Sequence, residues 1–203
     1  MNKWKQIKIA SLIAFASLLL TACSSLNPKA QAEMLKKYTY EVESVHDLKA
    51  GGMAIGNNFE GSSLSSLSSV ALGLLRKDLS LEAVVNMKVS NPTGEAVPMG
   101  PFKYLLEIQG KPFFEGSVNE SLSLANGQSK VVPLAFKANL FGVTDEKKGA
   151  EKLLSDILTR KGNGLIVLKI KPSVRIAGKD IYYPGYITVD NDLLKGISGL
   201  IKK

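Results

Sequence analysis

The sequence has few of the side chains that build metal centres and activated nucleophiles. Cys23 is the only cysteine and His46 the only histidine in a chain of 203 residues. A disulfide within the chain needs a second thiol and a zinc site needs several Cys or His ligands, so both are excluded. The Ser, Thr, Lys and Tyr side chains show no activating arrangement, and His46, beside Asp47, is expected at the surface. We therefore expect a protein that is not an enzyme and holds no metal or cofactor.

Positive charge is not concentrated in any one segment. The formal net charge is +8, but Lys3, Lys5 and Lys8 lie at the very start, and the chain after residue 22 has 23 basic and 18 acidic side chains. A nucleic-acid interface gathers Lys and Arg with aromatic residues on one strip, whereas here they are spread along alternating segments. We therefore expect no nucleic-acid partner.

The beginning of the chain lacks an apolar run long enough to cross a bilayer. Residues 9–20, IASLIAFASLLL, form an uncharged stretch of 12 residues, and a membrane-spanning helix needs about 20. The stretch follows the cationic residues 1–8 and precedes the small residues Thr21 and Ala22, which is typical of a secretory signal. A buried core helix is the alternative, but the flanking residues favour export. We expect residues 1–22 to be removed.

The only cysteine directly follows this stretch. Leu20, Thr21, Ala22 and Cys23 resemble the lipobox of bacterial lipoprotein precursors, in which a peptidase recognises the small residues and the thiol becomes a diacylglyceryl thioether. That resemblance implies an N-acylated Cys23, three acyl chains and stable anchoring. Ser24, in the position where Asp retains such proteins at the inner membrane, implies sorting to the outer membrane. The implied partners are membrane lipids and the lipoprotein processing and sorting machinery.

The remaining chain is divided by composition. Residues 23–37 are expected to form a lipidated tether, 38–190 a folded domain, and 191–203 an amphipathic tail. In the tail, apolar residues at helical spacing indicate either an interfacial membrane helix or a helix that closes one end of the domain. Those residues are Leu193, Leu194, Ile197, Leu200 and Ile201.

Alternating apolar and polar residues predict that the domain is mainly β. The clearest strand, 78–90, has Leu79, Leu81, Ala83, Val85, Met87 and Val89 on one face. Hairpin partners are expected at 104–108 and 113–118, and Pro133 predicts an edge or a bulge in the strand after Gly127. Further strands are expected over 165–176 and 180–189. Short strands with polar turns favour an antiparallel β-sandwich of immunoglobulin or fibronectin type.

Two short helices are expected between these strands. In the first, 64–75, the predicted buried stripe is Leu64, Leu67, Ala71, Leu74 and Leu75. The second, 145–161, has a stripe of Leu153, Leu154, Ile157 and Leu158, with Thr144 placed to cap its start.

The larger, C-terminal part of the domain resembles the late embryogenesis abundant (LEA) type 2 domain, also called the water stress and hypersensitive response domain. The resemblance covers residues 78–190, and its landmarks are Asn91, Pro92, Pro98, Tyr104, Gly110, Gly116, Asn126 and Gly127. None of them is a catalytic group. Members of that family adopt an immunoglobulin-like or fibronectin-like sandwich; some are tied to desiccation protection and others are suggested to bind lipids.

The resemblance therefore implies a non-catalytic, stress-related binding or protective domain on an envelope lipoprotein. The alternative is a carrier of a lipid or other apolar ligand, with a groove between the sandwich and a helix as its site. An envelope protein could also be a partner.

Overall fold

The computed structural model describes residues 27–55, 68–159, 165–190 and residue 193. The predicted signal peptide, Cys23 and Ser24 lie outside the described residues. So does the whole tail except Leu193, which is buried.

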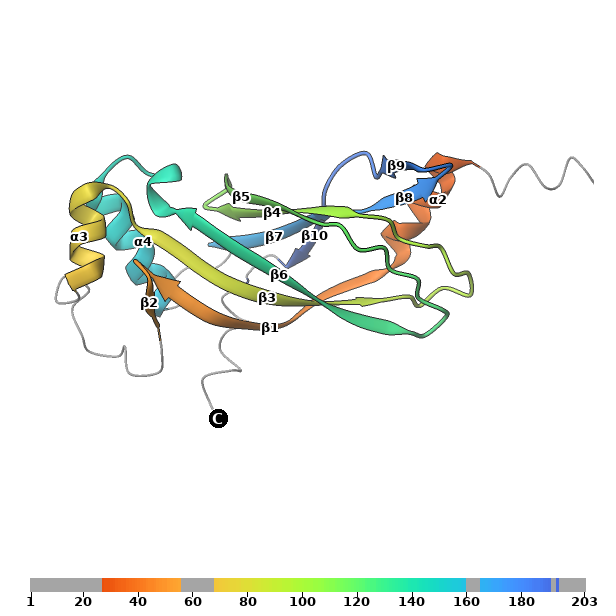
Figure 1. The fold of residues 1–203 in the computed structure, drawn as a ribbon, viewed down its shortest axis with the longest axis horizontal. Helices are drawn as coiled ribbons and strands as arrows, with labels where there is room; N and C mark the ends of the chain where they lie inside the picture. The colour runs from red at the N-terminus through yellow and green to blue at the C-terminus, as the bar shows by residue number, and fades with distance from the viewer. Residues whose placement is uncertain (1–26, 56–67, 160–164, 191–192, 194–203) are drawn as a thin grey trace, which may run out of the picture.

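Two four-stranded antiparallel sheets form the domain (Figure 1), which confirms the predicted mainly-β sandwich. The first has the order β2-β1-β3-β6, and the second has the order β10-β7-β4-β5. The strands of the first sheet are β1 (Thr39–Ala50), β2 (Met53–Ala54), β3 (Ser80–Ser90) and β6 (Ser129–Asn139). Those of the second are β4 (Phe102–Ile108), β5 (Lys111–Val118), β7 (Ile166–Lys171) and β10 (Ile187–Asp190).

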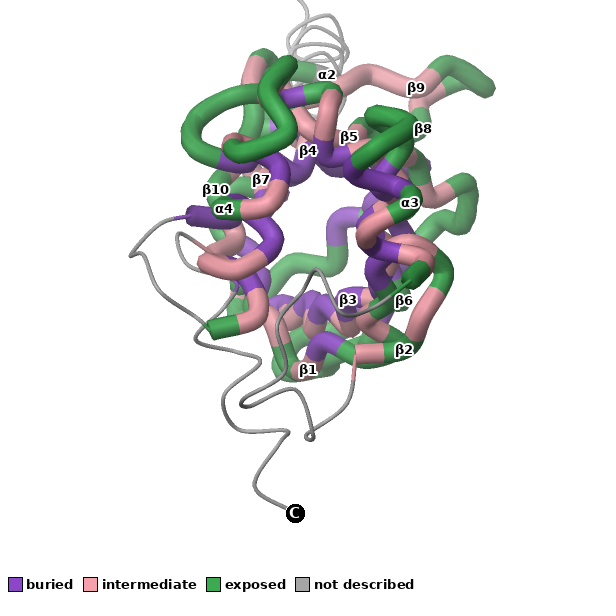
Figure 2. The backbone as a smooth tube through the Cα atoms, turned by 90° about the vertical axis from the view of Figure 1, so that its left-hand side faces the viewer, coloured by how far each residue is buried: buried purple, intermediate pink, exposed green. Residues whose placement is uncertain are grey.

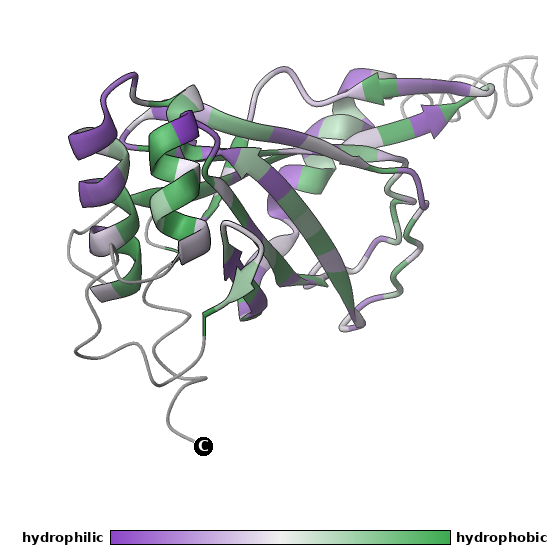
Figure 3. Cartoon of the chain, turned by 60° about the vertical axis from the view of Figure 1, so that its left-hand side comes forward, coloured by the Kyte–Doolittle hydropathy of each residue, from purple (hydrophilic) through white to green (hydrophobic). Residues whose placement is uncertain are grey.

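The core lies between the two sheets. Along β3 every second residue from Leu81 to Val89 is buried, as the alternation predicts, and Figure 2 shows buried positions on both sheets where they face each other. Figure 3 shows the alternation as hydrophobic and hydrophilic bands along the strands. Pro133 lies on β6, an edge strand, where its missing N–H breaks no ladder bond.

Tyr104 joins the two sheets at the side where β5 and β6 approach each other. Its hydroxyl, on β4, donates a hydrogen bond to the carbonyl oxygen of Ala135 on β6. Its ring lies over Gly116, its register partner on β5, where a Cβ atom would be 2.2 Å from the ring carbon Cζ. Only glycine leaves room for the ring, so the observed position of Tyr104 requires glycine at residue 116.

A third, two-stranded sheet differs from the sequence prediction. The segments expected as single strands over 165–176 and 180–189 are each broken, because Pro172 interrupts the first and Pro184 and Gly185 the second. Between the breaks, β8 (Ser173–Ile176) and β9 (Lys179–Tyr182) form a separate hairpin. Its turn, Ala177 and Gly178, has φ of 50° and 79°, the left-handed pair that a two-residue hairpin needs.

Three helices are described: α2 (Pro28–Met34), α3 (Ser68–Arg76) and α4 (Lys147–Thr159), with two 3-10 turns, η2 (Leu35–Lys37) and η5 (Leu140–Gly142). In α4 the predicted stripe is confirmed at Leu153, Leu154 and Ile157, which are buried with Ala150.

The stripe predicted for the first helix is wrong in part. Val70 and Leu74 are buried in α3, but Leu75 is 72% exposed and Leu72 44% exposed. Gly73 packs against the residues that lead into β3, since a Cβ atom here would lie 2.9 Å from the carbonyl oxygen of Asp78 and 3.2 Å from Cδ1 of Leu79. Gly73 and Leu74 therefore lie on the buried face of α3, and Leu75 lies on its exposed face. Leu64 and Leu67 lie outside the described residues.

Asn91 connects two loops at one end of the sandwich. Its side chain is fully buried; Nδ2 donates to the carbonyl oxygens of Glu95 and Leu124, and Oδ1 accepts from the N–H and hydroxyl of Thr93. Its backbone also bonds to Gln128 and Gly127. The sequence marks Asn91 only as a landmark of the family resemblance, because local spacing does not show its bonds to the second loop.

Candidate functional site

Lipidation at Cys23, recognition at Leu20, Thr21 and Ala22, and sorting at Ser24 stay predictions, since these residues are not described. The described chain begins four residues after Cys23, at Asn27. Asn27 caps α2, because its Oδ1 accepts from the N–H groups of Lys29 and Ala30 at 3.1 and 3.5 Å. A capped helix therefore begins close in sequence to the predicted anchor.

Helix α2 is docked on the domain, which differs from the expected tether over 23–37. Ala32 is 1% exposed and Leu35 is fully buried, and α2 contacts both strands of the β8–β9 hairpin. Both residues belong to the hydrophobic core of the domain. Residues 28–37 are therefore part of the folded domain and not of a tether.

Two tyrosines hold the end of this segment. The Tyr40 hydroxyl donates to the carbonyl oxygen of Leu35 at 2.7 Å, and the Tyr38 hydroxyl donates to the carbonyl oxygen of Val97 at 3.0 Å. Burial raises the pKa of both phenols above the ordinary value. The segment that follows α2 is therefore fixed both to the 3-10 turn η2 and to the loop that precedes β4.

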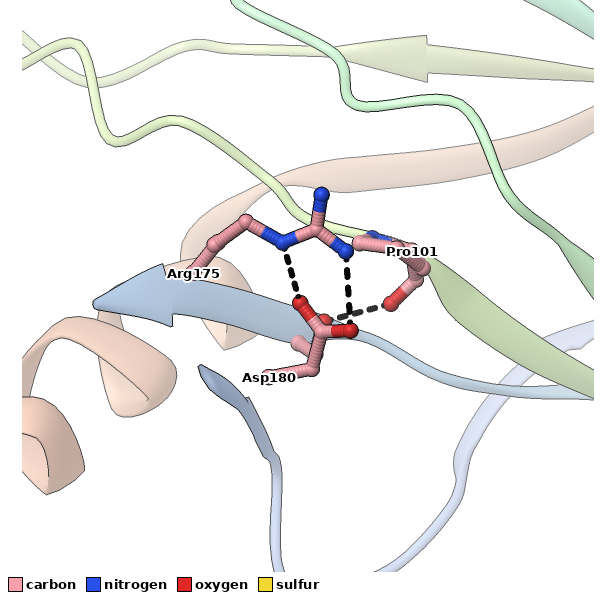
Figure 4. Close-up of polar contacts among 4 residues, drawn as sticks. Pro101, Arg175 and Asp180 are labelled. Carbon is pink, nitrogen blue, oxygen red and sulfur yellow. Dashed lines mark hydrogen bonds and ion pairs between the residues drawn. The ribbon is translucent and has the colours of Figure 1, made fainter. Parts of the chain in front are cut away.

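The β8–β9 hairpin is fixed to the start of β4. Ser173, which is buried, donates its hydroxyl hydrogen to the carbonyl oxygen of Pro101. Arg175 binds Asp180 through two parallel hydrogen bonds of 2.7 and 2.9 Å (Figure 4). The hydrogen bond from Arg175 lowers the pKa of the Asp180 carboxyl. The paired charges rigidify the hairpin and neutralise each other.

An open hollow of about 470 Å³ is a second candidate site. Its lining includes Glu82 and Lys137, which form an ion pair of 2.9 Å, and the rings of Phe114 and Phe136. The hydrogen bond from Lys137 lowers the pKa of Glu82. None of the lining residues belongs to a helix, so this hollow is not the expected groove between the sandwich and a helix.

The described residues contain no group of three His, Cys, Asp or Glu side chains placed to hold a metal ion. Within the same residues, no helix is both long and apolar enough to span a membrane. His46 is exposed, as expected, and its Nδ1 lies 2.8 Å from the carboxylate of Asp47. Sequence reasoning missed the docking of α2, for which the apolar spacing of Ala32 and Leu35 was the available signal.

No family model matches the sequence. No curated protein matches it either. Among solved structures, a protein from Archaeoglobus fulgidus is similar at 15% identity and a TM-score of 0.34, over 71% of this chain and 92% of that chain. A protein from Arabidopsis thaliana is similar at 14% identity and a TM-score of 0.36, over 54% of this chain and 70% of that one.

A third solved structure, described as that of "a putative late embryogenesis abundant (LEA) protein", is similar at 16% identity and a TM-score of 0.34, over 85% of this chain and 86% of that one. At these identities and scores the likeness assigns the chain to no family.

Proposed function

We propose that the chain is a lipid-anchored protein of the bacterial cell envelope, held at the outer membrane through Cys23 and facing the periplasm. The observation that carries this proposal is the order of cationic start, short apolar run and Leu20-Thr21-Ala22-Cys23. The position of α2, which begins only a few residues after Cys23, supports it, because a docked domain then follows the anchor directly.

We propose further that the sandwich domain acts without catalysis, in binding or protection under water stress. The support is the resemblance of residues 78–190 to the LEA type 2 domain. Its landmarks have structural roles here: Asn91 joins two loops, and Tyr104 with Gly116 joins the sheets.

Fractionation of a bacterial host tests the anchor. The parent should sediment with outer membranes, and the Cys23→Ser variant should leave them, since it has no thiol to acylate. If both fractionate alike, the anchor proposal fails. A deletion strain then tests the stress role: slower recovery than the parent strain after drying or osmotic shock is expected, and equal recovery would contradict it.

A second candidate function, binding of an apolar ligand, has the hollow beside Phe114 and Phe136 as its site. Native extraction followed by lipid mass spectrometry would then yield stoichiometric ligand. Ala135→Trp, which fills the hollow from an exposed position, would remove it. A parent protein without ligand would discard this candidate.

A further inference from the structure

The beginning of α2 and the turn of the β8–β9 hairpin are both exposed and lie at the same end of the domain. Figure 1 shows the beginning of α2 beside the turn of the β8–β9 hairpin, at the end of the long axis opposite α3 and α4. Contacts between α2 and both hairpin strands agree with this view. We call this the proximal end, and define it by Lys29, Ala177, Gly178 and Lys179.

The distance from the predicted anchor to the proximal end is short. Asn27 is the fourth residue after Cys23, and four steps of a fully extended chain span at most about 14 Å. Because Ala32 and Leu35 bury α2 against the domain, α2 does not lengthen this connection. An acylated Cys23 therefore keeps the proximal end near the headgroup layer.

The charge of the proximal end suits an anionic surface. Lys29 and Lys179 are exposed, and neither has a carboxylate within ion-pair distance in the part of the chain that the structure describes. The hairpin's Arg175 and Asp180 neutralise each other, and along α2 and η2 the exposed Glu33 is outnumbered by Lys29, Lys36 and Lys37. Electrostatic attraction to a surface acts over a Debye length of about 8 Å at physiological salt, so only charges held this close contribute.

From these observations we propose that the proximal end is a membrane-contact surface, on which Lys29 and Lys179 bind the phosphates of anionic lipid headgroups. This inference rests on the proposed anchor at Cys23. The domain then stands with α3 and α4 away from the bilayer. The strand β3, with 11 residues, alone spans about 35 Å of the long axis.

The acylated protein can be labelled at one chosen residue. Its only native thiol is consumed by the thioether, so an introduced cysteine is the only free thiol. Ala177→Cys places a fluorophore at the exposed hairpin turn, and Leu75→Cys places the same fluorophore at an exposed site on α3. Both lipidated proteins are reconstituted into phosphatidylcholine vesicles containing phosphatidylglycerol and a lipid with a short-range quencher on its headgroup.

The expected result is several-fold stronger quenching of the label at residue 177 than of the label at residue 75. Equal quenching, or stronger quenching at residue 75, would overturn the proposed orientation. Intact mass, measured before labelling, separates the two proposals. Protein without acyl chains means that the anchor has failed, whereas acylated protein with equal quenching contradicts this inference alone.

A charge-matched pair of variants tests the headgroup contact. Lys29→Gln with Lys179→Gln should lower quenching at residue 177 in phosphatidylglycerol vesicles to the level seen with phosphatidylcholine alone. Lys147→Gln with Lys148→Gln removes the same charge from exposed positions at the start of α4 and should leave quenching unchanged. If the two double variants behave alike, the lysines of the proximal end do not bind headgroup phosphates.

Discussion

At the scale of single residues, Asn91 shows how one buried side chain can connect segments far apart in the sequence. Its amide bonds Glu95 and Thr93 in its own loop and Leu124 in another. A buried amide is stable only if its donors and acceptors are paired. The loops at this end of the sandwich therefore depend on one residue.

Asn91→Ala should lower the free energy of unfolding by about 2 to 4 kcal/mol, because buried partners lose their hydrogen bonds. Urea denaturation measures the loss. Asn126→Ala, at an exposed turn position in the second loop, is the control and should cost less than about 0.5 kcal/mol. Equal losses would show that the Asn91 bonds contribute nothing particular.

Tyr40 predicts a dependence of stability on alkaline pH. Burial raises its pKa above the ordinary value of 10.0, so above that pH the unfolded phenol ionises while the folded one keeps its proton. Its contribution to stability is complete below pH 10 and is lost as pH rises toward the higher folded pKa. The free energy of unfolding should fall by up to about 1.4 kcal/mol per pH unit from this residue.

Urea denaturation from pH 8 to pH 11 measures this fall. Tyr40→Phe has no proton to lose at this position, so its stability should decline less steeply above pH 10 than that of the parent. Parallel curves for the two proteins would contradict the assignment.

At the scale of elements, α2 is part of the folded domain. Leu35, at its end, is fully buried, so Leu35→Ala should lower the free energy of unfolding by about 2 to 5 kcal/mol. The neighbouring Lys36 is exposed, and Lys36→Ala should cost less than about 0.5 kcal/mol. If Leu35→Ala unfolds at the same urea concentration as the parent, α2 does not contribute to the stability of the domain.

Two adjacent leucines test the orientation of α3. Leu74 is 3% exposed and Leu75 is 72% exposed, so Leu74→Ala should cost about 2 to 5 kcal/mol and Leu75→Ala less than about 0.5 kcal/mol. Unfolding in urea compares the two variants directly. Similar losses would restore the stripe that the sequence predicts, in which both leucines are buried.

The elements that the sequence predicts well are those whose burial is decided by one periodic face. β3 is the clearest case, since its alternation matches the observed burial from Leu81 to Val89. Prediction from the sequence fails where contact with a distant segment determines which residues are buried. The hairpin against which α2 packs lies about 140 residues away in the sequence.

At the scale of the whole molecule, the sequence predicts an antiparallel sandwich, and the topology confirms it. It does not predict that α2 and the β8–β9 hairpin lie together at one end, because their contact follows from the folded sheets. The proposed orientation on a membrane depends on this contact, while the proposed anchor depends on Cys23 and its neighbours in the sequence.

Intact-mass spectrometry of protein purified from an envelope-bearing bacterial host tests the anchor most directly. The account predicts a chain that begins at Cys23 and carries the added mass of a diacylglyceryl group and one further acyl group. An unmodified chain that still contains residues 1–22 would contradict it.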